Sequence, residues 1–254
     1  MNPFVLVFVG VVIVGLLLFV NNFRFLLYPL IPSLNPVRKA KRAILEGTSL
    51  FISDLHLRAN RPFQHSDDIR RVLQERQVSN LIVVGDLFDS PKDARKIAGD
   101  RVGSPIADIL GLEGLALNAF FIEGSPPHDP PLEEVAALNM TPLKQMGRCA
   151  ILDFGQTTVI AYHGHDMSGK GSIGHGWDRF ISKLSLESAW KRAAAIPDAY
   201  WVIFGHTHIP GIDVKRRVAN CGGWQPKRFL VRPARTGLLL SPETGSLEIV
   251  NFVH

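Results

Sequence analysis

The chain is poor in cysteine, and its first part has no acidic residue. Cys149 and Cys221 are the only cysteines among 254 residues, too few for a disulfide framework and not spaced like a zinc knuckle, so we expect a reducing compartment. The first Asp or Glu is Glu46, and five basic residues precede it. Because the whole chain has a net charge of +5, the rest of the chain is neutral. A neutral globular part argues against nucleic acid as a partner.

No charged residue interrupts the stretch from Phe4 to Val20, which contains only apolar residues and glycine. These 17 residues reach the lower limit for a helix that crosses a hydrocarbon core of about 30 Å. A cleaved signal peptide would need a basic segment before the run and a small-x-small site after it, and the sequence has neither. We therefore expect a transmembrane helix and its interfacial exit over residues 1–32, with a buried or interfacial helix as the alternative.

Basic residues follow the apolar run, and none precedes it. Four of them lie in residues 33–46, which we expect to be a basic juxtamembrane linker. Because flanks rich in Lys and Arg stay on the cytoplasmic side, the asymmetry predicts a single-pass membrane protein whose main domain, residues 47–254, faces the cytoplasm. The opposite orientation is the alternative.

Short apolar runs alternate with amphipathic stretches after the linker. A run over 49–53 is followed by Ile69, Val72 and Leu73 at helical spacing and by a second run over 81–84, which is typical of a β-α-β unit. Further strands are expected near 119–122, 149–152, 158–161 and 201–204, helices near 105–117, 132–146 and 178–195, and a hairpin over 237–250. These strands are too many for one parallel sheet, so we expect one α/β domain with two packed sheets and flanking helices.

Metal-binding residue types follow four of the expected strands. In chain order they are Asp54 with His56, Asp86 with Asp89, His163 with His165, and His206 with His208. Because the carboxyl ends of strands in an α/β sheet form one rim, we expect these side chains to converge. Asp and His ligands without thiolates suit Mn²⁺, Fe²⁺, Zn²⁺ or Mg²⁺, and the ligands are too many for one tetrahedral ion. The pattern predicts two divalent ions bridged by a carboxylate, an arrangement used in phosphoryl transfer.

The same segments resemble the calcineurin-like metallophosphoesterase family over about residues 49–225. The motifs that carry the resemblance are Asp54-Leu55-His56, Gly85-Asp86-Leu87-Phe88-Asp89, His163-Gly164-His165 and Gly205-His206-Thr207-His208. The resemblance implies an αββα four-layer sandwich that holds two divalent ions, of which we expect Mn²⁺ first. It also implies the ligand sets: Asp54, His56 and His208 on one ion, His163 and His206 on the other, and Asp86 as the bridge. Asp89, expected to orient a histidine ligand, and His165 are further catalytic candidates.

One motif departs from the family pattern, which is Gly-Asn-His-Asp or Gly-Asn-Arg-Asp with the Asn as a metal ligand. This chain has Gly124-Ser125-Pro126-Pro127-His128-Asp129 instead. Ser125 is then a weaker neutral ligand in place of the Asn. His128 is expected to contact the scissile phosphate, and the alternative is a proline-rich loop that only shapes the pocket.

The interpretation that follows is a membrane-anchored dinuclear-metal phosphoesterase, which cleaves a phosphomonoester, phosphodiester or pyrophosphate bond. Its partner would be a phosphorylated small molecule or a lipid-linked substrate at a membrane. Asp54-Leu55-His56-Leu57 and the Gly-His-Thr-His-x-Pro segment ending at Pro210 are also similar to the branch that hydrolyses UDP-2,3-diacylglucosamine. The alternatives are a metal-dependent nuclease of the same fold, which the neutral charge disfavours, and a catalytically weak binding scaffold, which the altered Ser125 loop suggests.

Overall fold

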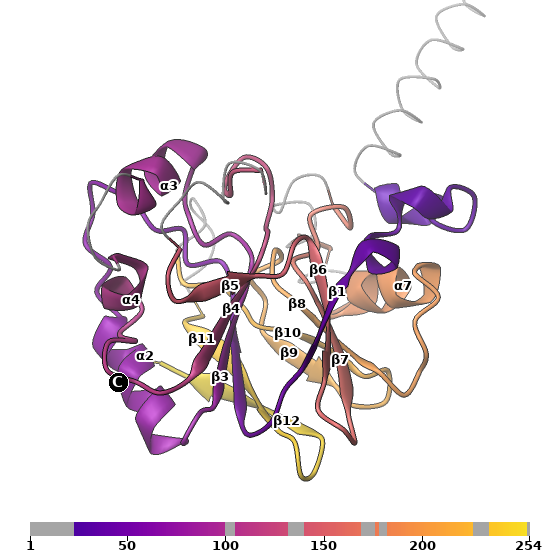
Figure 1. Cartoon of the computed structure of the whole chain (residues 1–254). Helices are drawn as coiled ribbons and strands as arrows, with labels where there is room; N and C mark the ends of the chain where they lie inside the picture. The colour runs from indigo at the N-terminus through magenta and orange to yellow at the C-terminus, as the bar shows by residue number, and fades with distance from the viewer. Residues whose placement is uncertain are drawn as a thin grey trace, which may run out of the picture.

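Two mixed sheets pack face to face in the structure, a computed structural model that describes residues 23–99, 105–131, 140–168, 176–177, 182–225 and 234–252 (Figure 1). Sheet A contains, in spatial order, β1 (Lys41–Ile44), β6 (Cys149–Asp153), β7 (Thr158–Tyr162), β8 (Trp201–Phe204), β10 (Val218–Asn220) and β9 (Gly211–Asp213). Sheet B contains β12 (Ser246–Asn251), β11 (Thr236–Ser241), β2 (Ser49–Ile52), β3 (Asn80–Val84), β4 (Asn118–Ile122) and β5 (Leu143–Gln145).

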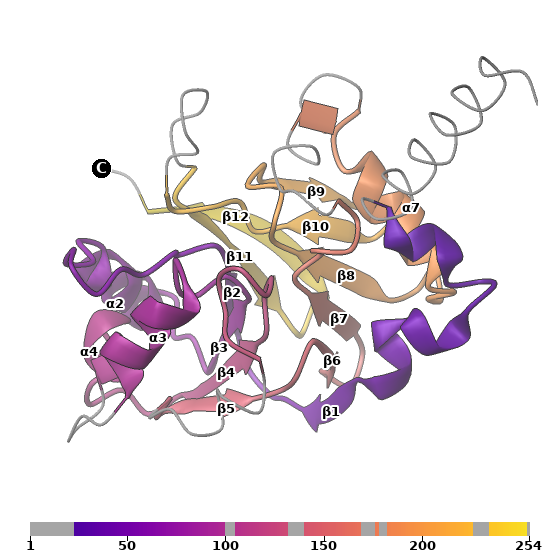
Figure 2. The ribbon, with the colours of Figure 1, turned by 90° about the horizontal axis from the view of Figure 1, so that it is seen from above.

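Helices cover the outer faces of both sheets (Figures 1 and 2). On sheet B they are α2 (Ser66–Glu75), α3 (Pro91–Ala98) and α4 (Pro105–Ile109). On sheet A they are α7 (Ser185–Ala193) and the 3-10 helices η1 (Arg24–Leu27), η2 (Pro32–Leu34) and η3 (Pro36–Lys39). The expected α/β architecture with two packed sheets and flanking helices is therefore confirmed.

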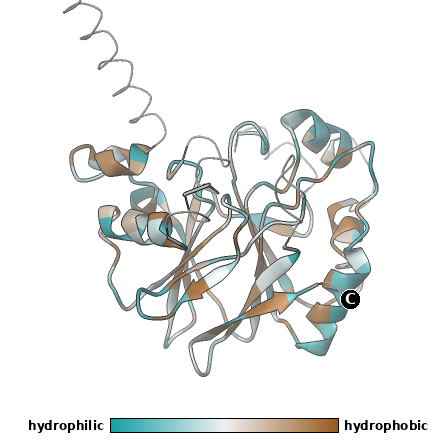
Figure 3. Ribbon diagram, turned by 180° about the vertical axis from the view of Figure 1, so that it is seen from behind, coloured by the Kyte–Doolittle hydropathy of each residue, from teal (hydrophilic) through white to brown (hydrophobic). Residues whose placement is uncertain are grey.

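Successive side chains along each strand point to opposite faces of the sheet, and this alternation fills both the space between the two sheets and the space under the helices. In β2, Leu50 and Ile52 pack toward the helices α2 to α4, whereas Phe51 packs between the two sheets. Because β2 is buried on both faces, it appears in the sequence as a continuous apolar run. The helix α2 is amphipathic and buries Ile69 and Val72, as its spacing predicts. Figure 3 shows hydrophobic and hydrophilic residues together on the outer helices.

The sheet order places the carboxyl ends of the central strands at one rim. β2, β3, β4 and β5 are parallel in sheet B, and β7, β8 and β10 are parallel in sheet A. The expected hairpin is β11 and β12, paired from Thr236↔Asn251 to Ser241↔Ser246. The helix expected over 132–146 is wrong at its end, because β5 is a strand; residues 132–139 lie outside the described residues.

The N-terminal part differs from its expectation. Of the expected linker over 33–46, residues 41–44 form β1, which pairs in parallel with β6 from Lys41↔Ala150 to Ile44↔Asp153. Tyr28, expected at an interfacial exit, is buried against α7, where its ring stacks edge-on against Trp190 and its hydroxyl donates a hydrogen bond to Asp166. The folded domain thus begins before residue 47.

The expected single-pass membrane localisation is contradicted by the described residues. Among them, every helix is too short or too polar to cross a bilayer. The apolar run over 4–20, on which that expectation rested, lies outside the residues that the structure describes.

Candidate metal centre

Short loops after five strands bring the predicted ligands together at the rim. Asp54 and His56 follow β2, Asp86 follows β3, His163 follows β7, and His206 and His208 follow β8, while Ser125 follows β4. Two groups of three result, which we call the outer cluster (Asp54, His56 and His208) and the inner cluster (Asp86, His163 and His206). The convergence expected from the sequence is therefore what the fold produces.

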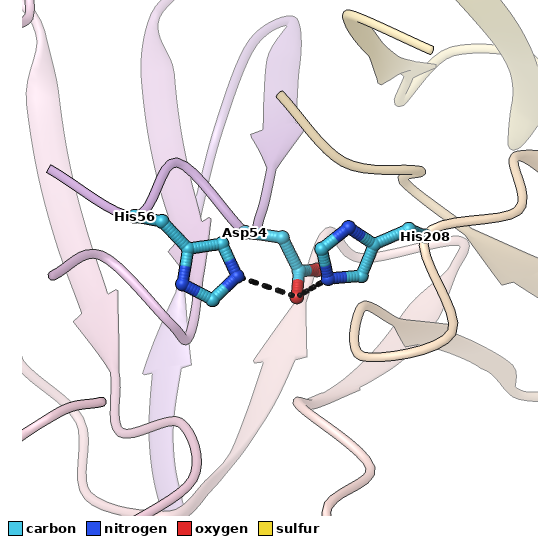
Figure 4. A group of neighbouring side chains, drawn as sticks. All are labelled: Asp54, His56 and His208. Carbon is cyan, nitrogen blue, oxygen red and sulfur yellow. Dashed lines mark ion pairs between the residues drawn. The ribbon is translucent and has the colours of Figure 1, made fainter. Parts of the chain in front are cut away.

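The outer cluster is centred on one oxygen of Asp54 (Figure 4). Its Oδ1 lies 3.0 Å from Nε2 of His208 and 3.9 Å from Nε2 of His56. The other oxygen, Oδ2, accepts hydrogen bonds from the Ser53 hydroxyl at 2.7 Å and from the backbone N–H of His206 at 2.9 Å. One carboxylate oxygen is thus fixed by the protein, and the other faces two imidazoles.

All three residues of the inner cluster are buried. Nε2 of His163 lies 3.2 Å from Oδ1 of Asp86, and Nδ1 of His163 hydrogen-bonds the carbonyl of Val84 at 2.9 Å. Nε2 of His206 hydrogen-bonds the carbonyl of Ser168 at 2.8 Å. These two hydrogen bonds to backbone carbonyls fix the tautomer of each ring. The remaining nitrogens, Nε2 of His163 and Nδ1 of His206, are therefore the ones suited to bind a metal.

Both clusters fit a cation, as two buried atoms show. Asp54 Oδ1 and His163 Nε2 are buried, and their ion-pair contacts, with His208 Nε2 at 3.0 Å and with Asp86 Oδ1 at 3.2 Å, do not have hydrogen-bond geometry, so neither atom has a hydrogen-bond partner among the described residues. A divalent ion would satisfy an acceptor oxygen and imidazole nitrogens at the same place. Carboxylate and imidazole donors without thiolates suit Mn²⁺, Fe²⁺, Zn²⁺ or Mg²⁺.

The electrostatics of the buried groups favour charge at the carboxylates. Burial alone would raise the pKa of Asp54, but His208 and His163 outweigh it and hold that pKa below its usual range. Burial likewise raises the pKa of Asp86, but the neighbouring histidines, with His163 first, together outweigh burial and hold that pKa well below its usual range. Burial lowers the pKa of His56 to about 4, so this imidazole is neutral near pH 7, as a metal ligand must be.

Five of the six cluster residues have left-handed backbone conformations. Asp54, His56, Asp86, His206 and His208 have φ between +48° and +68°. Such a conformation costs a non-glycine residue about 1–2 kcal/mol. Strain of this kind persists only where the surrounding structure fixes it, and it concentrates at functional sites. The rim therefore holds its ligands in conformations that the local sequence does not favour.

Glycines bring the backbone of neighbouring loops close to these ligands. A Cβ added at Gly85 would lie 2.6 Å from the His163 ring and 2.7 Å from the backbone of Gly124. Gly85 also has φ of +76°, which favours glycine. Because residue 85 has no Cβ, the loops that follow β3, β4 and β7 can pack in direct contact.

The altered loop after β4 makes direct contact with the predicted bridging carboxylate. Both the backbone N–H and the hydroxyl of Ser125 donate hydrogen bonds to Oδ1 of Asp86 at 2.7 Å. Asp129 closes the same loop, because its oxygens accept hydrogen bonds from the backbone N–H groups of Gly124 at 2.8 Å and Phe88 at 3.2 Å. Burial, with the nearby charge of Asp86, raises the pKa of Asp129 to about 8.

A third group, which we call the mouth cluster, contains His56, Asp89 and His128 and is partly exposed. Nδ1 of His128 donates to the carbonyl of Asp89 at 2.8 Å, and Nε2 lies 3.9 Å from Oδ2 of Asp86. The Asp89 carboxylate lies 4.0 Å from Nδ1 of His56 and 3.0 Å from Nε of Arg58. Asp89 thus orients His128 through its backbone, whereas its carboxylate is beyond hydrogen-bonding distance of His56.

His165 lies outside the three clusters of the described residues. Its ring stacks against His163 with centroids 6.4 Å apart, and burial lowers its pKa to about 3. The structure brings together eight of the ten predicted site residues as cluster members and places Ser125 on the carboxylate of one of them. The catalytic role of His165 stays a prediction.

A buried polar network beneath the β8 loop was not found as part of the site from the sequence. Nδ2 of Asn220 donates to the carbonyl of Gly205 at 2.6 Å, to Thr207 Oγ1 at 3.1 Å and to Glu187 Oε1 at 3.0 Å. Its Oδ1 accepts the backbone N–H of Gly222 at 2.9 Å. Glu187 lies in the distant helix α7, and nothing in the sequence near it indicates this role.

Comparisons with known proteins found structures but no curated relative. No curated protein matches the chain. The phosphoesterase YfcE from E. coli is 12% identical, with a TM-score of 0.45 and coverage of 81% of this chain and 100% of its own. An archaeal phosphodiesterase is 16% identical, with a TM-score of 0.46 and coverage of 80% and 98%. Vps29 complexed with zinc, from Entamoeba histolytica, is 15% identical, with a TM-score of 0.46 and coverage of 81% and 99%.

The family assignment rests on a sequence profile. The profile of the calcineurin-like phosphoesterase superfamily domain matches residues 48–245, which is most of the chain. This match includes every ligand of the outer and inner clusters. The chain therefore belongs to the calcineurin-like phosphoesterase superfamily and is a metal-dependent hydrolase acting on phosphoester bonds.

Proposed function

We propose that the protein is a dinuclear-metal phosphoesterase that hydrolyses a phosphorylated small molecule, with Mn²⁺ as the preferred ion. One observation carries this proposal: the two oxygens of Asp86 face different clusters. Oδ1 lies 3.2 Å from Nε2 of His163 in the inner cluster, and Oδ2 lies 3.9 Å from Nε2 of His56 in the outer cluster. A carboxylate in this position supports the role of a bridge between two ions.

In this proposal the outer cluster holds one ion, and the inner cluster holds the other with Ser125 as a neutral partner. When bound, two divalent ions polarise the phosphoryl oxygens and stabilise the charge that develops on the attacking and leaving oxygens. The protein supplies the ligand geometry and a largely buried site, in which electrostatic interactions are stronger than in water.

His128 is the proposed general acid. Because its Nδ1 donates to the carbonyl of Asp89, Nε2 is the nitrogen that faces the site. In the protonated ring, Nε2 can hold a proton for the leaving oxygen of the substrate. The side chain is about one third exposed, so it lies where a substrate can reach it. The similarity to the UDP-2,3-diacylglucosamine hydrolase branch stays a prediction.

The test is hydrolysis of bis(p-nitrophenyl) phosphate and p-nitrophenyl phosphate by protein stripped of metal and reloaded with Mn²⁺, Mg²⁺, Zn²⁺ or Fe²⁺. We expect activity only after reloading and the highest rate with Mn²⁺. Asp86→Asn, which removes the charge of the proposed bridge, should be nearly inactive with every ion, whereas the control Glu243→Gln, in the exposed β11–β12 turn, should be fully active. Absence of hydrolysis with all four ions would favour the binding scaffold instead.

A further inference from the structure

A cavity of about 390 Å³ lies beside the mouth cluster, formed by the loop after His56 and the helices α3 and α4. Its walls include Leu57, Phe63, Ile97 and Ile109, and Arg58 and Arg61 also line it. This volume and this mixture of apolar walls with a few polar groups are typical of small-molecule sites. The described metal-binding and catalytic candidates do not line this cavity.

Two contacts connect the cavity to the metal centre. On one side, Arg58 pairs with Asp89 at 3.0 Å, and Asp89 belongs to the mouth cluster with His56 and His128. On the other side, the Phe63 ring lies against Trp224, with centroids 5.8 Å apart. The backbone N–H of Trp224 donates to the carbonyl of Asp54 at 3.1 Å. The cavity walls are therefore held by the same segments that hold the outer cluster.

The two arginines indicate the charge of the ligand. Arg58 and Arg61 form an isolated antiparallel bridge, which places their side chains on the same face. Like charges directly opposite each other are destabilising. Asp89 compensates Arg58, and among the described residues no carboxylate pairs with Arg61. An anionic group bound at the edge of the cavity would compensate this charge.

We propose that this cavity binds the apolar substituent of the substrate, so that the enzyme prefers anionic phosphoesters of aromatic or aliphatic alcohols. This inference rests on the proposed function, because the phosphoryl group must lie at the metal clusters. The mouth cluster is the partly exposed side of the centre, and Leu57 in the cavity wall directly follows His56 of that cluster, so the cavity is the neighbouring space that the substituent of a bound phosphoester would enter. Apolar surface leaving water then contributes to affinity.

Phosphonates test this pocket without turnover. Calorimetry on the Mn²⁺-loaded full chain would compare phenylphosphonate with methylphosphonate, which differ only in the substituent. We expect phenylphosphonate to bind at least about tenfold more tightly, since a buried aromatic ring removes a large apolar area from water. Equal affinities in the wild-type protein would overturn the inference.

Two variants locate the effect. Ala59→Trp places a large ring in the cavity from an exposed loop position, and Ile109→Asn makes one wall polar. Both should reduce the phenyl-to-methyl preference to within about twofold. Val214→Trp, exposed and outside the cavity, is the matched control and should keep the wild-type preference. Metal content and circular dichroism identify a variant that has failed to fold, and the second variant then decides.

The outcomes separate the two proposals. If methylphosphonate binds and phosphoesters are hydrolysed, but Ala59→Trp and Ile109→Asn keep the preference, the pocket assignment is wrong and the proposed function stands. If neither phosphonate binds to the metal-loaded protein, the phosphoryl-binding centre itself is wrong, and the inference falls with it.

Discussion

The outer and inner clusters contain the same residue types, one Asp and two His, but they are built differently. In the inner cluster all three side chains are buried, and Oδ1 of Asp86 already accepts two hydrogen bonds from Ser125. In the outer cluster, Oδ1 of Asp54 accepts no hydrogen bond from the described residues. The neutral partner beside this oxygen is the Ser125 hydroxyl, which is a weaker metal ligand than an amide oxygen. We therefore expect the inner ion to bind more weakly, although its site is more enclosed.

We expect the largest effect from removing the charge of Asp86, the carboxylate that both clusters share in this proposal. Asp86→Asn should lower hydrolysis by at least about 100-fold and reduce the content of both ions, because each cluster loses a charged oxygen. Asp54→Asn should first deplete the outer ion. Metal analysis and rates with bis(p-nitrophenyl) phosphate measure both effects. Full activity of Asp86→Asn would contradict the proposal that Asp86 bridges two ions.

Removing the support under the β8 loop should affect both clusters together. Asn220→Ala breaks three side-chain donations, of which those to Gly205 and Thr207 hold the loop that carries His206 and His208. We expect about 10- to 100-fold weaker metal binding. Asn118→Ala is the control, because Asn118 lies at the start of β4, at the end of the strand away from the metal-binding rim. Unchanged metal affinity with lower unfolding free energy would make Asn220 purely structural.

The Ser125 position sharpens the comparison within the inner cluster alone. An amide oxygen is a better neutral ligand than a hydroxyl, so Ser125→Asn should tighten the weaker ion about tenfold and leave the tighter ion unchanged. Ser125→Ala should instead weaken the binding of the inner ion relative to the wild type. Titrations of metal-free protein followed by fluorescence would measure both. If neither substitution changes the weaker affinity, another residue completes the inner cluster.

The smallest effect concerns the loop that supports the inner cluster. Asp166 accepts hydrogen bonds from Tyr28 and Trp190, but burial outweighs them and raises its pKa to about 7 from an ordinary value of 3.8. The folded state therefore favours the neutral form, so its contribution to stability is complete below pH 4 and falls as the pH rises to about 7.

Urea unfolding of the wild type and Asp166→Asn at pH 5 and pH 8 measures this contribution. The wild type should lose more unfolding free energy between these pH values than the variant, by about 1.4 kcal/mol for each pH unit between pH 5 and the folded-state pKa of about 7. Because the variant keeps every other titratable group of the wild type, the difference reports on Asp166. Identical pH dependence would show that Asp166 is ionised in the folded protein.

Much of the site could be predicted because its ligands directly follow buried strands. Asp54 and His163 come immediately after apolar runs, and the rim of an α/β sheet brings such residues together. The β1 strand could not be predicted, because its residues have no apolar pattern and its pairing with β6 is distant in sequence. Glu187 and Asp129 acquire their roles only from partners that the tertiary structure supplies.

Titration of metal into the metal-free protein is the most direct test of two unequal sites. Isothermal calorimetry with Mn²⁺, with hydrolysis of bis(p-nitrophenyl) phosphate measured in parallel, gives affinity and activity for the same samples. We expect two binding events of unequal affinity, with activity appearing as the weaker, inner ion binds. A single ion at saturation, or two ions of equal affinity with full activity after the first, would contradict it.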